Sequence, residues 1–112
     1  MPQNVGGISF SAVFEDRSKT DVGIFYYPDQ VAVEVREDGR QIFYDYANTE
    51  LKMPLLMEEV KQVLSELFTR HGTIIRYYAS TRYLIVDCIQ CKEANHYFMR
   101  AVLFSIDSIH FD

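Results

Sequence analysis

The sequence predicts an α+β domain with two layers, in which helices lie on one antiparallel sheet of five or six strands. The expected order is β-β-β-β-α-β-β-α, with one long central helix and a C-terminal helix. Much of the chain alternates apolar and polar residues with the period of a strand, whereas two segments repeat their apolar residues at helical spacing. With 112 residues, the chain is expected to form a single domain over 1–112, with a flexible lead-in at 1–7.

The first two strands are indicated by alternation and by a turn. In residues 8–15, "ISFSAVFE", Ile8, Phe10, Ala12 and Phe14 fall on one face and the polar side chains fall on the other, as in a half-buried strand. The apolar run "VGIFYY", residues 22–27, predicts a second strand, because Pro28-Asp29 follows it as a turn signal.

The third and fourth strands form the clearest hairpin in the sequence. In residues 31–36, the three valines fall on one face while Glu34 and Arg36 fall on the other, as a strand with one buried face requires. Asp38-Gly39 then supplies the positive φ angles that a two-residue hairpin turn needs. The return strand, residues 41–46, is expected to place Tyr44 and Tyr46 on one side.

The strongest helix signal covers residues 53–71. Pro54 suits the first turn, where its missing N–H costs nothing, and Gly72 suits the left-handed position after the last turn. His71 comes at the end, where the helix dipole favours a positive charge. The apolar residues that recur at helical spacing and form one stripe are Leu56, Val60, Val63, Leu64, Leu67 and Phe68.

Two more strands and a second helix are expected after this helix. The segments "TIIRYYA", residues 73–79, and "RYLIVDCI", residues 82–89, are predicted to form a hairpin around Ser80-Thr81. From residue 92 to 109 the apolar residues return to helical spacing, which predicts a C-terminal helix. The alternative is that residues 101–106, "AVLFSI", form an edge strand.

The charge distribution argues against nucleic-acid binding. The net charge is −5, and the 11 basic residues are scattered, whereas a phosphate backbone requires clustered Lys and Arg. The first residues lack the basic and apolar regions of a signal peptide, and no apolar run approaches the roughly 18 residues of a membrane span. We therefore expect a cytoplasmic protein with reduced thiols, no nucleic-acid partner and no membrane contact.

Cys88 and Cys91 form a C-x-x-C spacing, which raises the question of a metal or redox site. A structural zinc site needs four ligands, and this pair with the more distant His96 supplies too few. A thioredoxin-like pair would open a helix, whereas Cys88 falls inside a predicted strand. We expect Cys88 to pack in the core, and no metal or cofactor. Asp87, on an apolar strand face, is expected to pair with Arg76.

The aromatic content is the most distinctive feature of the composition, with eight Tyr, eight Phe and no Trp. Aromatic residues fit strands, but exposed clusters of them also mark protein interfaces. Residues 23–30, "GIFYYPDQ", contain three consecutive rings, so at least one ring points away from the core that the others fill. The residues predicted to bind a partner protein are Phe25, Tyr26, Tyr27, Tyr44, Tyr46, Tyr77 and Tyr78.

The favoured function is a non-enzymatic protein-binding module, such as an adaptor, an inhibitor or immunity-type protein, or a chaperone. The order strand-strand-strand-helix-strand-strand-helix resembles the later portion of the small secretion-chaperone fold, whose members begin with a helix that has no counterpart here. Those chaperones are small, acidic, cytosolic and dimeric, so the resemblance implies a homodimer. The alternative is a small enzyme or ligand-binding domain with a pocket between sheet and helix, lined by Asp87, Cys91 and His96.

Overall fold

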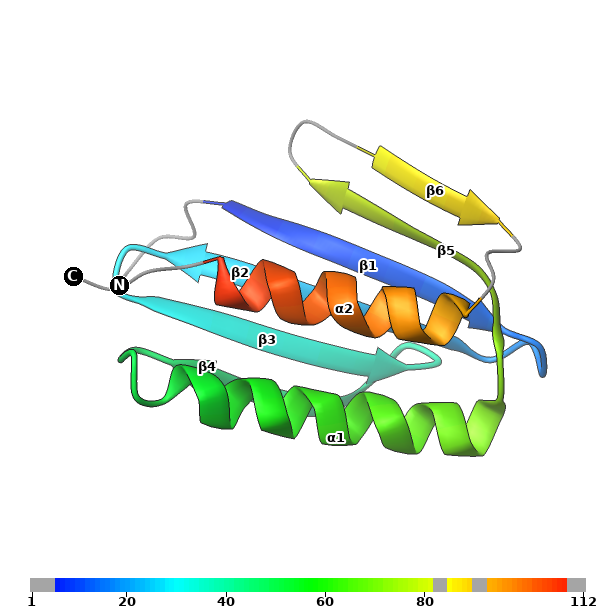
Figure 1. Cartoon of the computed structure of the whole chain (residues 1–112), viewed down its shortest axis with the longest axis horizontal. Coiled ribbons are helices and arrows are strands. Elements are labelled where there is room, and N and C mark those ends of the chain that lie inside the picture. Colours follow the sequence, from blue (N-terminus) through cyan, green and yellow to red (C-terminus); the bar gives the residue numbers. More distant parts are fainter. Residues whose placement is uncertain (1–5, 82–84, 90–92, 109–112) are drawn as a thin grey trace.

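The computed structural model describes residues 6–81, 85–89 and 93–108, with side chains described for residues 6–80 and 93–108 (Figure 1). It shows an α+β fold in which the order of elements agrees with the prediction. In chain order the elements are β1 (Gly6–Phe14), β2 (Lys19–Tyr27), β3 (Gln30–Glu37), β4 (Arg40–Ala47), α1 (Met53–His71), β5 (Ile74–Thr81), β6 (Ile85–Ile89) and α2 (Ala94–Asp107).

The strands form one six-stranded sheet in the order β4-β3-β2-β1-β5-β6, and all neighbours are antiparallel. The first four strands run as a meander, because each is joined to the next by a short turn. Helix α1 then carries the chain back across the sheet, so that β5 pairs with β1 on its free side. Strand β1 therefore lies inside the sheet, although it is the first element that the structure describes.

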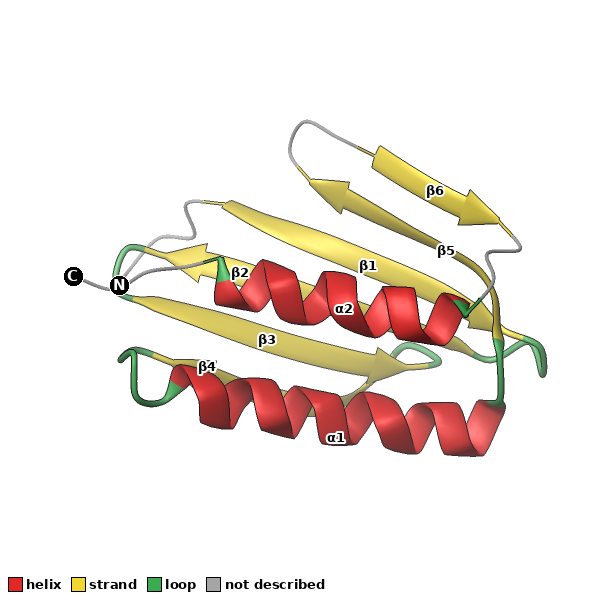
Figure 2. Cartoon of the chain, in the orientation of Figure 1, coloured by secondary structure: helices red, strands yellow, loops and turns green. Residues whose placement is uncertain are grey.

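Both helices lie on the same face of the sheet, which we call the inner face (Figure 2). Side chains alternate along each strand, so that every second residue of β1, β2 and β3 points toward the helices. The ring of Phe98 in α2 packs edge-on against Phe10 of β1, with 6.1 Å between ring centroids. The fully buried core residues on this face include Phe10, Phe14, Val22, Ile24, Val33, Leu56, Leu64, Phe98 and Val102.

The boundaries of α1 agree with the predicted range of 53–71, and the predicted end signals account for them. Pro54 lies in the first turn, where no N–H is needed. Gly72 has a φ of 86°, a backbone conformation that other residues rarely adopt, and its N–H donates to the carbonyl of Phe68. Helix α2 is confirmed as a helix, so the alternative edge strand at residues 101–106 is wrong.

The predicted turn between β3 and β4 is confirmed, since Asp38 and Gly39 have φ angles of 49° and 84°. Two other boundaries differ from the prediction. Gly6 and Gly7 belong to β1, because they pair with β2 as part of the sheet. Ser80-Thr81 does not form the second hairpin turn, because β5 continues through Thr81 and pairs with β1 there.

The two described helices test the prediction that no segment spans a membrane as a helix. Neither α1 nor α2 combines the length and the apolar character that a membrane-crossing helix requires. Helix α1 has 19 residues, but charged and polar side chains cover its outward side. Its apolar stripe, which includes Leu56 and Leu64, is buried against α2 and the sheet.

Candidate functional site

Five of the seven predicted partner-binding side chains point away from the helices, to the opposite side of the sheet, which we call the outer face. Alternation along each strand places them there, on the side opposite the buried core residues of the same strand. No helix covers this face in the part of the chain that the structure describes. The five residues are Phe25 and Tyr27 of β2, Tyr44 and Tyr46 of β4, and Tyr78 of β5.

Four of these residues form a group that we call the outer aromatic cluster, consisting of Phe25, Tyr27, Tyr44 and Tyr46. At its centre, Ala32 of β3 lies in register between Phe25 and Tyr46. Although Ala32 is on the outer face, none of its surface is exposed, so the neighbouring rings close over it. A small residue at this position therefore allows the rings to lie close to the sheet.

The ring of Phe25 is held down in the same way by a second small residue. A Cβ atom on Gly23 would lie 2.9 Å from the tip of the Phe25 ring, so this ring covers Gly23 along its own strand. Tyr44 and Tyr46 remain open to solvent, with 51% and 39% of their surface exposed. The ammonium group of Lys52 lies 4.3 Å from the centroid of the Tyr46 ring, which favours this ring position through a cation–π contact.

Tyr78 lies on the outer face but apart from the outer aromatic cluster. Its neighbour in β1 is Ser11, which is followed across the sheet by Asp21 of β2 and Arg36 of β3. The Ser11 hydroxyl donates to the Asp21 carboxylate over 2.6 Å. A polar row therefore runs from Tyr78 across the sheet, while the apolar part of the outer face lies over β2, β3 and β4.

The structure places Tyr26 and Tyr77 on the inner face, with the core. The Tyr26 hydroxyl donates to the carbonyl of Ser105 in α2 over 2.8 Å, and burial raises the pKa of Tyr26. The Tyr77 ring packs edge-on against Phe98, with 5.6 Å between centroids, and burial also raises its pKa. These two tyrosines join α2 to the sheet. Five of the seven residues that were predicted to bind a partner therefore remain on the outer face.

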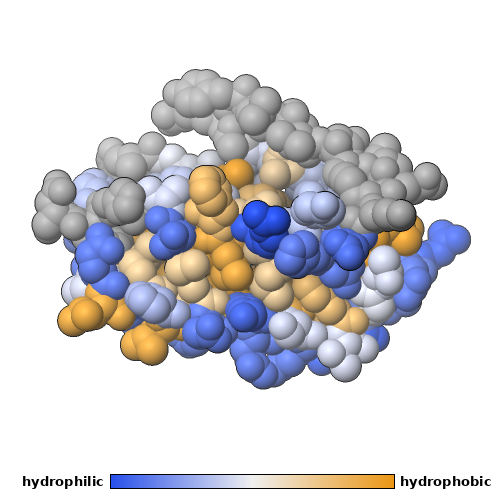
Figure 3. All heavy atoms as spheres, viewed as in Figure 1, coloured by the Kyte–Doolittle hydropathy of each residue, from blue (hydrophilic) through white to orange (hydrophobic). Residues whose placement is uncertain are grey.

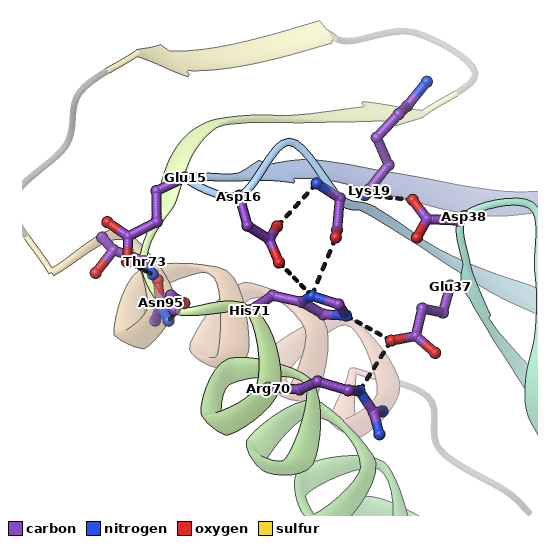
Figure 4. Close-up of polar contacts among 11 residues, drawn as sticks. Glu15, Asp16, Lys19, Glu37, Asp38, Arg70, His71, Thr73 and Asn95 are labelled. Carbon is purple, nitrogen blue, oxygen red and sulfur yellow. Dashed lines mark hydrogen bonds and ion pairs between the residues drawn. The ribbon is translucent and has the colours of Figure 1, made fainter.

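A second group of polar side chains meets at the end of α1 (Figure 4). The Nδ1 of His71 lies 2.6 Å from a carboxylate oxygen of Asp16, in the turn between β1 and β2. Its Nε2 lies 2.5 Å from Glu37 at the end of β3, and Arg70 reaches the same Glu37 oxygen at 3.0 Å. The hydroxyl of Ser18 is 3.0 Å from Nδ1. Residues distant in sequence thus meet in a group that spacing alone did not indicate.

We call Asp16, Glu37 and His71 the histidine clip, because they join the end of α1 to two hairpin turns. The hydrogen bond with Glu37 raises the pKa of His71 most, and the hydrogen bond with Asp16 raises it further. The bond with His71 lowers the pKa of Glu37, and a hydrogen bond from the backbone N–H of Ser18 lowers that of Asp16. A positive imidazolium between two carboxylates is the state that these bonds stabilise.

The presence of Ser18 gives the histidine clip the residue types of a hydrolase triad, but not its geometry. In a triad, one imidazole nitrogen accepts the serine proton while a carboxylate holds the other nitrogen. Here Ser18 and Asp16 share Nδ1, and Glu37 occupies Nε2, so neither nitrogen is left to act as a base. The arrangement instead suits a structural ion pair that holds three chain segments together.

The residues of the predicted alternative site are described only in part. His96 is exposed on α2, where its ring lies 5.8 Å from the ring of Tyr97. Cys88 pairs with Tyr77 through the backbone, and Asp87 with Tyr78, but their side chains lie outside the described residues, as does Cys91. The predicted bond between Asp87 and Arg76, and the core packing of Cys88, therefore stay predictions.

Within residues 6–80 and 93–108, no group of three or more His, Cys, Asp or Glu side chains is placed to hold a metal ion. No protein-family model matches the chain. No curated protein matches it. No solved structure matches it either. The function therefore has to be inferred from the arrangement of the side chains themselves.

Proposed function

We propose that this chain is a non-enzymatic, cytoplasmic protein-binding module of the adaptor, inhibitor or chaperone type, and that it binds its partner through the outer aromatic cluster. One observation carries this proposal: exposed aromatic rings gather on the face of the sheet that the helices leave uncovered. The open rings are those of Tyr44 and Tyr46, beside the half-buried Phe25 and Tyr27.

The chemistry of the cluster suits the centre of a protein interface. Such centres are enriched in aromatic residues and depleted of charges, and Tyr is a frequent contributor of binding energy. A tyrosine ring loses little conformational entropy on binding, because only two side-chain torsions need to be fixed. The Phe25 ring is already held over Gly23, and the cation–π contact with Lys52 favours one position of the Tyr46 ring. Part of the surface is therefore ordered before a partner arrives.

Two ion pairs lie beside the cluster, as at the rim of an interface. Arg36 forms an ion pair of 2.9 Å with Glu34, which lies beside Tyr44 in the register of β3 and β4. On the other side, Lys52 reaches Asp45 at 3.4 Å. Because these charges already have partners, binding an apolar surface over the cluster need not leave them unpaired.

The proposal is tested by capturing proteins from an extract of the native cells on the immobilised chain. The double variant Tyr44→Ser/Tyr46→Ser removes the two open rings and is expected to lose the captured partner. A matched control is Ile75→Ser, which truncates a side chain of similar exposure, 46%. Ile75 belongs to β5, which lies toward the edge of the sheet opposite β4. This control should retain the partner at the wild-type level.

The folded state of each variant is checked by its thermal unfolding, which should change little because both tyrosines are exposed. If the double variant captures the same proteins in the same amounts as the wild type, the cluster is not the binding surface. Equal loss with Ile75→Ser would also contradict the proposal, because the loss would then not be specific to the rings.

A further inference from the structure

Strand β4 is the last strand on one side of the described sheet, so one of its edges has no neighbouring strand there. Alternate residues of an antiparallel strand direct their N–H and C=O groups to the same neighbour. The N–H of Asp38 donates to a carbonyl of β2, so even-numbered residues of β3 bond to β2 and odd-numbered ones bond to β4. Val33 therefore bonds to Asp45, and the backbone groups of Tyr44 and Tyr46 point away from the sheet.

The side chain of Asp45 caps one of these outward backbone groups. The N–H of Tyr46 donates to the Asp45 carboxylate over 2.8 Å. Lys52, just before α1, donates to the same carboxylate oxygen over 3.4 Å. A strand that paired with β4 would have to displace both contacts before it could reach the N–H of Tyr46.

The ammonium group of Lys52 lies across this edge. It is 3.4 Å from Asp45, whose side chain shares the inner face with Val33. It is also 4.3 Å from the centroid of the Tyr46 ring, on the outer face. Because these contacts lie on opposite faces of one strand, the ammonium group sits beside the backbone of β4. A neighbouring strand would run in the same place, about 4.8 Å from β4, so the two cannot be there together.

The other end of this edge is interrupted by a change of register. The pairing of β3 with β4 shifts between Val35 and Arg36, which indicates a bulge that bends the strand. Between the bulge and the capped N–H of Tyr46, the described sheet offers a short stretch of edge centred on Tyr44. Such a stretch gives another strand few hydrogen bonds, since strands usually pair over at least about three residues.

Helix α1 helps to keep Asp45 charged. A hydrogen bond with Asp45 raises the pKa of Glu59, which places the shared proton on Glu59. Although burial opposes the change, bonds with the N–H of Tyr46 and with Glu59 lower the pKa of Asp45. The carboxylate that accepts from Tyr46 therefore remains charged at neutral pH. Helix α1 lies beside β4, and Figure 3 shows hydrophilic side chains along this helix.

We propose that Asp45 and Lys52 form a lock on the edge of β4, which keeps this edge from pairing with the same edge of another copy of the chain. Unpaired edges are a common route to association, and charged side chains at an edge oppose it. The lock leaves the rings of Tyr44 and Tyr46 exposed on the outer face while it closes the backbone beside them. This role is separate from partner binding by the outer aromatic cluster and does not depend on it.

The double variant Asp45→Ala/Lys52→Ala removes the lock, and sedimentation velocity from about 1 to 200 µM measures the result. This unlocked variant should self-associate at least about tenfold more tightly than the wild type, because the opened edge can pair with another copy. The matched control is Glu34→Ala/Arg36→Ala, which removes an ion pair of similar exposure from β3, inside the sheet. It should associate as the wild type does. Each double variant loses one acid and one base, so both keep the net charge of −5.

Adding Tyr44→Pro to the unlocked variant tests whether the edge is where association occurs. Proline removes the outward N–H of position 44 but no bond to β3, and strand edges tolerate proline for this reason. Association should return to the wild-type level. Tyr44→Ala in the same background removes the ring but keeps the N–H, so this variant should still associate.

Amide hydrogen exchange, followed by NMR at a concentration where the chains do not associate, tests the cap itself. The Tyr46 amide should exchange about fivefold faster in the unlocked variant than in the wild type, as expected for the loss of one hydrogen bond. The amide of Ala47, which bonds to Val31 of β3, should stay slow in both. In the control variant, the Tyr46 amide should exchange at the wild-type rate.

Any of three results would overturn the proposal: an unlocked variant that associates no more than the control, association that survives Tyr44→Pro, or a Tyr46 amide whose exchange does not change. Thermal unfolding shows that each variant folds, as expected because the substituted side chains are partly exposed. If the double variant does not fold, Lys52→Ala alone clears the ammonium group from the edge, and it is compared in the same way with Arg36→Ala.

Discussion

The histidine clip gives the sharpest prediction for stability. The variant His71→Gln keeps a polar side chain at the end of α1 but removes the positive charge between Asp16 and Glu37. The side chain of His71 is only 12% exposed and that of Glu37 is 17% exposed, so their bond is partly shielded from water. The Asp16 carboxylate is 42% exposed, and solvent screens most of its contribution.

The expected loss follows from these exposures. A hydrogen bond between charged groups contributes about 1.5–3 kcal/mol when it is well shielded, and a positive charge at a helix C-terminus adds about 0.3–1 kcal/mol. Allowing for the residual exposure of both side chains, we expect His71→Gln to lower the free energy of unfolding by about 1–2 kcal/mol at a pH where His71 is charged. In a domain of this size, that corresponds to a fall in Tm of roughly 4–8 °C.

The pH dependence identifies the cause of this loss. The pKa of His71 is raised above its ordinary value of 6.5, so its contribution is complete below pH 6.5 and is lost as the pH rises through the raised value. The pKa values of Glu37 and Asp16 are lowered from 4.5 and 3.8, so their contribution is lost as the pH falls through those lowered values. The clip should therefore stabilise the fold most between pH 4.5 and 6.5.

Circular dichroism melts at about pH 5.5 and about pH 9 measure this effect directly. The difference in Tm between wild type and His71→Gln should be largest near pH 5.5 and should shrink near pH 9. The control is His96→Gln, at an exposed position of α2. If the difference between wild type and His71→Gln is the same at both pH values, the charge of His71 does not hold the three segments together, and the reasoning is wrong.

Three further predictions concern the fold. Gly72→Ala should lower the free energy of unfolding by about 1–2 kcal/mol in a urea titration, because φ is positive and the added Cβ would meet the Glu15 side chain. Gly39→Ala is the control, because Gly39 has a similar φ of 84° but open space around it, and this variant should lower the free energy of unfolding by less. Tyr26→Phe should lower the free energy of unfolding by about 0.5–1 kcal/mol, because the Ser105 carbonyl still accepts a hydrogen bond from the Ser108 hydroxyl. This variant should not change partner capture, and a large binding defect would place Tyr26 in the interface. Leu64→Ala should cost about 2–5 kcal/mol by the same titration, and a value below about 1 kcal/mol would contradict its complete burial.

The elements themselves were predictable because their signals are local. Apolar spacing, Pro54 and Gly72 gave the bounds of α1, and the Asp38-Gly39 pair gave the turn between β3 and β4. The order of strands in the sheet was not predictable in this way. Alternation shows that β1 is a strand with one buried face, but it does not show that β5 pairs with its free edge.

The histidine clip and the aromatic surface show the same limit for functional residues. His71 meets Asp16 across 55 positions in sequence, so a pattern in any short window cannot reveal the contact. For Tyr26 the signal was present, because strict alternation puts it opposite Phe25 and Tyr27; the prediction grouped the three rings instead of separating them by face. The centre of the cluster, at Ala32, depends on register across three strands, which the sequence does not specify.

The central position of β1 has a consequence for synthesis of the chain. When the ribosome has made only the first four strands, one edge of β1 has no partner. This edge pairs with β5, where Phe10 lies opposite Ala79, and β5 is made later. An unpaired strand edge readily pairs with other chains, so nascent or truncated forms that end after α1 are expected to aggregate. Once β5 has been made, it pairs with this edge of β1 and removes it as a site for such pairing.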